Sequence, residues 1–190
     1  MLFSVIVDAH EFGLPQSRWP QISLTAGVAV CEVLGRSASR PVGLKWPNDV
    51  WLNDRKVCGI LVEVPPAQRG RLVIGIGLNV NNSFVEAPSE LQPIATSLRD
   101  ETGAEFDRVQ LLGDVVRQLD ADLCRLAAQD PSLPDRWRHW CVLRTRTVSL
   151  DTGRDLVIGH CLGLADDGAL RLQTSAGERQ FYGGIVRHIA

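Results

Sequence analysis

The segment from Leu72 to Asn81, LVIGIGLNVN, constrains the fold of this chain more than any other stretch. Side chains alternate between the two faces of a β-strand, so every second residue of the segment shares a face. One face is wholly apolar and comprises Leu72, Ile74, Ile76, Leu78 and Val80. The other is nearly bare and comprises Val73, Gly75, Gly77 and Asn79. We therefore predict a strand with one face in the core and one face open.

The glycines on the bare face carry a cost in stability. Each destabilises a strand by about 0.5–1 kcal/mol relative to alanine. That cost is tolerated where another molecule must approach the backbone closely. Asn79 ends the bare face, and its side-chain amide can both donate and accept hydrogen bonds. The segment therefore predicts a ligand site, with the alternative that Asn79 only caps the end of the strand.

Polar residues are concentrated earlier in the chain, in the motif KWPND at positions 45–49. Pro47 has a fixed φ angle and favours extended geometry at Trp46. Lys45 is then the last residue of a strand, and Asn48 and Asp49 begin a turn. This arrangement predicts a positioned cation. The alternative is structural: an exposed, solubilising lysine followed by a turn-forming aspartate.

A β-hairpin is predicted directly after this motif. The segments 50–52 and 56–64 are rich in Val, Ile, Leu and Trp, and residues 53–55 (Asn-Asp-Arg) have the composition of a turn. Lys56 lies at the start of the second strand. The apolar run 57–62, with Gly59 inside it, predicts a strand that is buried on both faces and has one point of close backbone approach.

These three motifs, KWPND, RKVCGILVE and GIGLNVN, resemble in order and spacing the central motifs of biotin protein ligases, also called biotin–acetyl-CoA-carboxylase ligases. The resemblance implies an α+β fold. It has a mixed or antiparallel sheet with packed helices, similar to class II aminoacyl-tRNA synthetases, and a small C-terminal SH3-like β-barrel. The implied reaction joins biotin and ATP into biotinyl-5′-AMP, with Mg²⁺. The biotin then passes to a lysine of a biotin carboxyl carrier protein.

The resemblance also implies roles for individual residues. Lys56 would contact the biotin carboxylate and the phosphate of the adenylate, and Asp49 would orient or deprotonate the carrier lysine. The residues implied for biotin are Lys56, Gly59, Ile60, Leu61 and Gly75. Those implied for the nucleotide are Lys45, Asn48, Asp49, Gly77 and Asn79. No protein-bound metal site is predicted.

One part of the family pattern is not found in the chain. The arginine- and glycine-rich loop of the family has no GRGR-like counterpart in these 190 residues. Residues 1–7 resemble the strand that follows that loop, so we expect the N-terminal part of the catalytic domain to be missing. The alternatives are a non-catalytic fragment that retains a carrier-docking or dimer-forming surface, and a lipoate-type acyl ligase. A DNA-binding repressor is disfavoured because no helix-turn-helix segment precedes the motifs.

Composition limits the partners. The net charge of −2 gives no general attraction to nucleic acid or to anionic membranes. The apolar run at residues 2–7 is too short for a signal peptide, so a cytoplasmic protein is expected. The five cysteines are odd in number and widely spaced, which favours buried reduced thiols over disulfides or zinc. A homodimer is predicted from the exposed strand at residues 1–7.

Two domains are predicted, residues 1–141 and 142–190. In the first, helices are expected over 21–35 and from Asp107, the latter with an apolar face of Val109, Leu112, Val116, Leu119, Leu123 and Leu126. In the second, short strands are expected at 145–150, 157–164, 169–173 and 180–185. Asp166 and Asp167 are interpreted as a turn before Gly168 in preference to a metal pair. The segment 65–71 is interpreted as a hairpin connection in preference to a phosphate loop.

Overall fold

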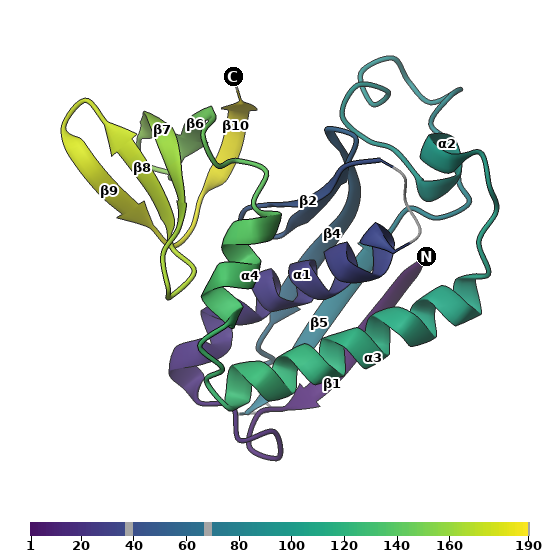
Figure 1. Cartoon of the computed structure of the whole chain (residues 1–190), viewed down its shortest axis with the longest axis horizontal. Helices are drawn as coiled ribbons and strands as arrows, with labels where there is room; N and C mark the ends of the chain where they lie inside the picture. The colour runs from purple at the N-terminus through teal and green to yellow at the C-terminus, as the bar shows by residue number, and fades with distance from the viewer. Residues whose placement is uncertain (37–39, 67–69, 190) are drawn as a thin grey trace.

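The computed structural model describes residues 1–36, 40–66 and 70–189. It is an α+β structure with two five-stranded antiparallel sheets (Figure 1). The first sheet has the strand order β1-β5-β4-β3-β2. Its strands are β1 (Leu2–Asp8), β2 (Val42–Lys45), β3 (Asp49–Leu52), β4 (Arg55–Glu63) and β5 (Arg71–Leu78). β1 is an edge strand of this sheet, as predicted.

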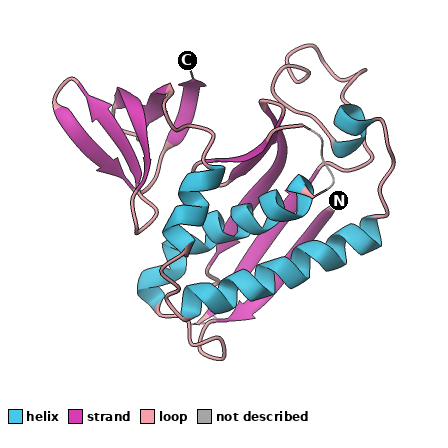
Figure 2. Ribbon diagram, viewed as in Figure 1, coloured by secondary structure: helices cyan, strands magenta, loops and turns pink. Residues whose placement is uncertain are grey.

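Helices cover one face of the first sheet (Figure 2). The helices lying across this face are α1 (Ile22–Gly35) and α3 (Arg108–Ala127), while α2 (Leu98–Thr102) lies apart from them at one end of the molecule. The remaining helices are η1 (Gln16–Gln21) and α4 (Leu133–Trp140). α1 contains mostly apolar residues, is mostly buried, and packs against both α3 and the sheet. Beneath the helices, Leu72, Ile74 and Ile76 of β5 are fully buried, which confirms the predicted core face.

The second sheet has the order β10-β6-β7-β8-β9. Its strands are β6 (Thr147–Asp151), β7 (Leu156–Leu164), β8 (Leu170–Thr174), β9 (Gly177–Phe181) and β10 (Ile185–Ile189). The prediction of one last strand over 180–185 was wrong. The strand is interrupted at Gly183–Gly184, where Gly184 has a φ of 138°. This change of direction lets β10 return to pair with β6.

The prediction that residues 57–62 are buried on both faces was also wrong. Cys58 and Ile60 are buried, but Leu61 is 59% exposed and Val62 is partly exposed. On the same face of the sheet, Leu2 and Ile6 of β1 are 86% and 69% exposed. An apolar run cannot by itself show whether a second layer covers it, and within the described residues this face is open.

The buried side of α3 matches the prediction at Leu119, Leu123 and Leu126 but is rotated from it in the first half of the helix. Val109 is 79% exposed and Val116 is also exposed. The buried residues are Leu111, Val115, Leu119, Asp122, Leu123 and Leu126. Asp122 can be buried on this side because its Oδ1 accepts a hydrogen bond from Arg136 Nη1 of α4 at 2.7 Å. Arg136 also pairs with Glu32 of α1, so an ion network joins the three helices.

The hairpin predictions hold. β3 and β4 pair antiparallel across Asn53 and Asp54, whose φ angles are 52° and 60°. β4 and β5 also pair antiparallel, as expected for a connection at 65–71, of which residues 67–69 lie outside the described residues. Residues 37–39, between α1 and β2, also lie outside the described residues.

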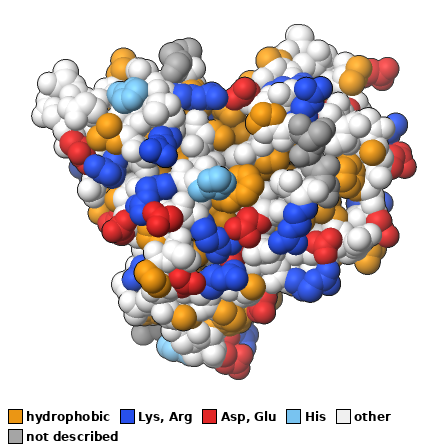
Figure 3. All heavy atoms as spheres, viewed as in Figure 1, with side chains coloured by type: hydrophobic (Ala, Val, Ile, Leu, Met, Phe, Trp, Pro, Cys, Tyr) orange, Lys and Arg blue, Asp and Glu red, His pale blue; other side chains and the backbone are white. Residues whose placement is uncertain are grey.

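None of the described helices is long and apolar enough to cross a membrane. The surface viewed in Figure 3 mixes basic and acidic side chains.

Candidate active site

The helix-free side of the first sheet, here called the open face, carries three glycines side by side. The register of β4 and β5 pairs Gly59 with Gly77 and Leu61 with Gly75. A Cβ atom added at Gly75 or Gly77 would meet no atom closer than 3.6 Å, which is an ordinary van der Waals contact, so neither position is tightly packed. This arrangement confirms that the bare face of β5 is accessible and makes a shallow trough floored by backbone.

Lys56 lies over this trough. A Cβ atom at Gly59 would be 3.0 Å from Lys56 Nζ, so the lysine side chain passes directly above the glycine. Lys56 Nζ forms an ion pair with Asp49 Oδ1 at 2.6 Å. The Lys56 side chain is 45% exposed, and that of Asp49 is 17% exposed. The ammonium group is therefore both positioned by a carboxylate and accessible to a ligand.

The backbone of Lys56 is also held in place. Its N–H donates to Ile94 O at 2.9 Å, and its carbonyl accepts from Thr96 N at 2.9 Å. The sequence predictions gave residues 94–96 no part in the site. No local signal could have revealed this contact, because 38 or more residues separate the segment from Lys56 in the sequence.

A cavity of about 450 Å³, here called the lysine cavity, brings several predicted site residues together. Its lining includes Lys56, Gly59, Gly77 and Asn79. The backbone N–H of Asn79 donates to Val57 O, and its carbonyl accepts from Leu98 N. The end of β5 is thus fixed beside the start of β4. Burial raises the pKa of the Cys58 thiol, in the same lining, to about 12, so this cysteine stays protonated and unreactive.

A second cavity of about 510 Å³, here called the junction cavity, lies between the first sheet and β10. It contains Lys45, Asp49 and Lys56, together with Arg146 and Arg187 from the second half of the chain. The two arginines are functional candidates that the predictions missed, because no motif marks them. Arg146 pairs with Asp54 at 3.1 Å, so this cavity is cationic but partly neutralised.

Lys45 is more enclosed than Lys56. Its Nζ donates to Val186 O at 3.3 Å and lies 5.2 Å from the centre of the Trp51 ring. Burial lowers the pKa of the Lys45 ammonium group, and the nearby Asp49 carboxylate opposes that shift. Lys45 and Lys56 are the only lysines in the chain. Both line the junction cavity.

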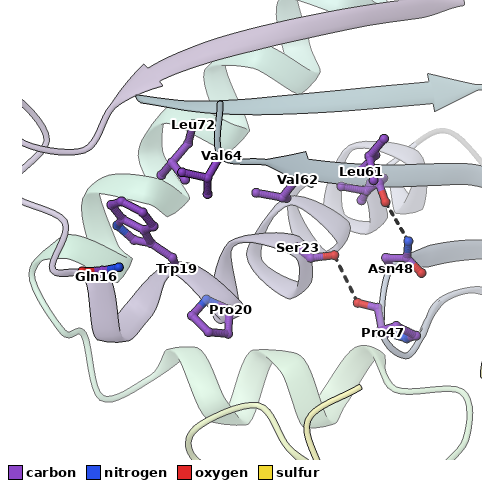
Figure 4. A pocket seen from close by; sticks show the side chains of 11 residues that line it. Gln16, Trp19, Pro20, Ser23, Pro47, Asn48, Leu61, Val62, Val64 and Leu72 are labelled. Carbon is purple, nitrogen blue, oxygen red and sulfur yellow. Dashed lines mark hydrogen bonds between the residues drawn. The ribbon is translucent and has the colours of Figure 1, made fainter. Parts of the chain in front are cut away.

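Asn48, Ile60 and Leu61 lie apart from these residues, at a third cavity of about 520 Å³ called the edge cavity. Figure 4 shows Trp19 of η1 on one side of it and Leu61 of β4 on the other. Asn48 Nδ2 donates to Ile60 O at 2.7 Å, so this amide braces the strand. Ile60 is buried on the face opposite Leu61. The Trp46–Pro47 peptide bond beside this cavity is cis.

The interpretation of Asp166 and Asp167 as a turn is confirmed. Asp167 Oδ1 accepts from Ala169 N at 3.1 Å, and Asp166 pairs with Arg138. In the part of the chain that the structure describes, no group of three His, Cys, Asp or Glu side chains could hold a metal ion. The five cysteines are free; Cys124 is exposed, contrary to the expectation of buried thiols, and the other four are buried.

Known proteins match this chain along most of its length. Residues 1–81 match the Biotin/lipoate A/B protein ligase family. The chain is 34% identical over 189 residues to the biotin–acetyl-CoA-carboxylase ligase of Mycobacterium tuberculosis, covering 96% of this chain and 68% of that protein. It is 30% identical over 177 residues to the bifunctional ligase/repressor BirA of Bacillus subtilis, covering 91% of this chain but only 54% of that protein. The chain therefore spans about half the length of this second relative.

Solved structures agree with the sequence relatives. A crystal structure of biotin protein ligase from Aquifex aeolicus has a TM-score of 0.87 and 27% identity, covering 98% of this chain and 81% of that one. The same protein in complex with biotin and ATP has a TM-score of 0.83 and 27% identity, covering 100% and 77%. Given these matches and the three motifs gathered around Lys56, the chain belongs to the biotin protein ligase family.

Proposed function

We propose that this chain carries the catalytic residues of a biotin protein ligase, which activates biotin with ATP and transfers it to a lysine of a biotin carboxyl carrier protein. The observation that carries the proposal is the position of Lys56 Nζ above Gly59, at the edge of the lysine cavity. An accessible cation beside a backbone floor suits a ligand that has an apolar body and a carboxylate. The similarity to a ligase solved with biotin and ATP supports the same function.

The first step would form a mixed anhydride. A biotin carboxylate oxygen attacks the α-phosphorus of ATP, and the bond from that phosphorus to the bridging oxygen breaks to release pyrophosphate. Catalysis of such a step depends mainly on positioning and on stabilising negative charge. Lys56 would neutralise the carboxylate and α-phosphate oxygens as they approach each other. Lys45 would supply a second cation toward the phosphates from the junction cavity.

The second step would form the amide. The amine of the carrier lysine attacks the acyl carbon, AMP leaves, and the amine loses a proton. Asp49 is the carboxylate closest to Lys56 and would orient that amine or accept its proton. Asn79 and Gly77 would border the nucleotide. Asn48 lies at the edge cavity, apart from Lys56, so we assign it a role in bracing β4, because its amide donates to Ile60 O.

Mg²⁺ would act mainly through the phosphate oxygens of ATP. The described residues contain no three-ligand acidic or histidine cluster, so an ion held by the nucleotide fits them better than one held by the protein alone. Asp49 and Asp54 are the acidic residues of the junction cavity and could contribute single oxygens.

The carrier protein requires a docking surface near the open face. β3 pairs with β4 only as far as Gly59, and Asn48 bonds to Ile60, so among the described residues no strand pairs with the outer edge of β4 beyond this point. Backbone groups at Val62 would therefore be open to an added strand from the carrier or from a second copy of this chain. The free edge supports the proposed carrier and dimer interactions equally.

We further propose two domains, residues 1–141 and 142–190, in the cytoplasm. The first would share the sheet-and-helix core of class II aminoacyl-tRNA synthetases, and the second would be an SH3-like barrel. The end of α4 at Trp140 and the separate hydrogen bonding of the two sheets support this division.

Transfer of labelled biotin to a purified carrier domain, with ATP and Mg²⁺, tests the function. Lys56→Ala should lower the rate of adenylate formation about 10²–10³-fold, since one charged group that stabilises a transition state contributes that much. Arg117→Ala on α3 removes an exposed charge far from the cavities and should have no effect. Preference for lipoate over biotin would instead identify a lipoate-type ligase. Absence of transfer together with weak binding of biotinyl-AMP that Lys56→Ala does not reduce further would identify a non-catalytic fragment.

A further inference from the structure

The short strand β2 ends at Lys45 and is held by the second half of the chain at every residue from Gly43 to Trp46. Leu44 O accepts a hydrogen bond from Val142 N at 3.0 Å, and Lys45 Nζ donates to Val186 O. A Cβ atom at Gly43 would lie 2.2 Å from Val142 Cγ1, so only glycine permits this approach. The motif that carries Lys45 and Asp49 therefore rests against the second sheet and its connection.

The contact at Trp46 is the most specific of these. Trp46 is buried, and its indole Nε1 donates to Gly168 O at 3.1 Å. Gln21, at the start of α1, is also buried, and its Nε2 donates to Asp167 O at 3.1 Å. Two consecutive carbonyl groups of the β7–β8 turn thus accept hydrogen bonds from two buried side chains of the first half.

The β7–β8 turn is itself preorganised for this contact. Asp167 Oδ1 accepts from Ala169 N, and Asp167 Oδ2 accepts from Tyr182 Oη at 2.8 Å. Gly168 has a φ of 88°, and a Cβ atom there would lie 2.7 Å from Leu24 Cδ1 of α1. Both the backbone conformation and the close packing therefore require glycine at this position.

We propose that Trp46 is a positioning residue, held by the turn at Asp167–Gly168, which fixes the orientation of Lys45 and Asp49 in the junction cavity. Two nearby residues of the same motif depend on the position of Trp46. Lys45 precedes Trp46 and must keep its Nζ between Val186 O and the Trp51 ring. Asp49 lies three residues later and must keep its carboxylate 2.6 Å from Lys56 Nζ. The turn at Asp167–Gly168 would thus contribute to adenylate formation through the tryptophan, without touching the substrates. The catalytic part of this inference rests on the proposed function.

Trp46→Phe tests the proposal, because it removes the indole N–H and keeps an aromatic ring. We expect kcat for adenylate formation to fall about tenfold or more while KM for biotin changes little, since small misplacements of catalytic groups mainly reduce rate. Gly168→Ala, which displaces the turn, should have the same effect. Trp137→Phe is the matched control. Trp137 is equally buried, but within the described residues its indole nitrogen has no hydrogen-bond partner. This variant should lose stability without losing kcat.

A second readout does not depend on activity. Reductive methylation with ¹³C-formaldehyde labels the amino terminus and the two lysines, so Lys45 gives an isolated NMR signal. Trp46→Phe and Gly168→Ala should shift the Lys45 signal and raise the pKa of that amine toward its ordinary value as burial is lost. Trp137→Phe should do neither. An unchanged Lys45 signal together with unchanged kcat in Trp46→Phe would overturn the proposal. If the parent protein shows no ligase activity, the proposed function fails, and the Lys45 signal alone decides whether Trp46 positions this lysine.

Discussion

The two faces of β5 differ in what they contribute, although they belong to one strand. Leu72, Ile74 and Ile76 on the covered face are fully buried beneath the helices. Gly75 and Gly77 on the open face leave the backbone accessible. Apolar burial on the covered face stabilises the sheet. The glycines of the bare face lower strand stability but leave space for a ligand to approach the backbone. Fold stability and ligand binding should therefore be separable by substitution at adjacent positions of one strand.

The largest effect is expected on the covered face. Ile74→Ala removes a buried side chain and leaves a cavity, which should lower the free energy of unfolding by about 2–5 kcal/mol. Urea denaturation measures this change. Biotin binding by the protein that remains folded should match the parent, because Ile74 does not reach the open face. Weakened biotin binding with unchanged stability would contradict the assignment of functions to the two faces.

The next effect is expected at the trough. Gly59→Ala places a Cβ atom 3.0 Å from Lys56 Nζ and 3.1 Å from Lys56 Cε, so the flexible lysine end must move away. We expect the rate of adenylate formation to fall about tenfold or more, because the cation is displaced from its position. The unfolding free energy should change by about 1 kcal/mol or less, since alanine suits a strand better than glycine.

Gly75→Ala is the matched control for that substitution. Its Cβ atom would meet Leu61 O at 3.6 Å, an ordinary contact, and would not approach Lys56. Stability should remain or rise, while KM for biotin increases because the trough becomes shallower. If Gly59→Ala and Gly75→Ala lowered kcat equally, displacement of Lys56 would not be the cause of the loss in Gly59→Ala.

The smallest effect concerns pH. Burial lowers the pKa of Lys45 in the folded protein, whereas the unfolded chain keeps the ordinary value. Between these two values the unfolded state binds more protons, so stability should rise with pH across this alkaline window. Below the window both states are charged, and the burial cost is constant. Lys45→Met should remove this part of the dependence of unfolding free energy on pH, measured by urea titrations at several pH values. If the substitution leaves the pH dependence unchanged, another group causes it.

The sequence predicted what depends on local pattern. Alternation identified both faces of β5, and turn composition identified the β3–β4 hairpin that carries Lys56. The family motifs identified Lys56, Gly59, Gly77 and Asn79, which share one cavity. The sequence could not show what lies across the fold. The exposure of Leu61, the burial of Asp122 in α3, and the approach of Arg146 and Arg187 all depend on contacts between distant segments.

The two lysines have a further consequence if biotinyl-adenylate forms in this protein. A mixed anhydride acylates any unprotonated primary amine that it encounters, and arginine guanidinium groups resist this reaction. Every other basic side chain among the 20 lysines and arginines is an arginine. Lys56 is paired with Asp49, and Lys45 is bonded to Val186 O. Apart from the amino terminus, the chain thus offers its own reactive intermediate only these two primary amines, each held by a partner, which would leave most of the acyl group for an external acceptor.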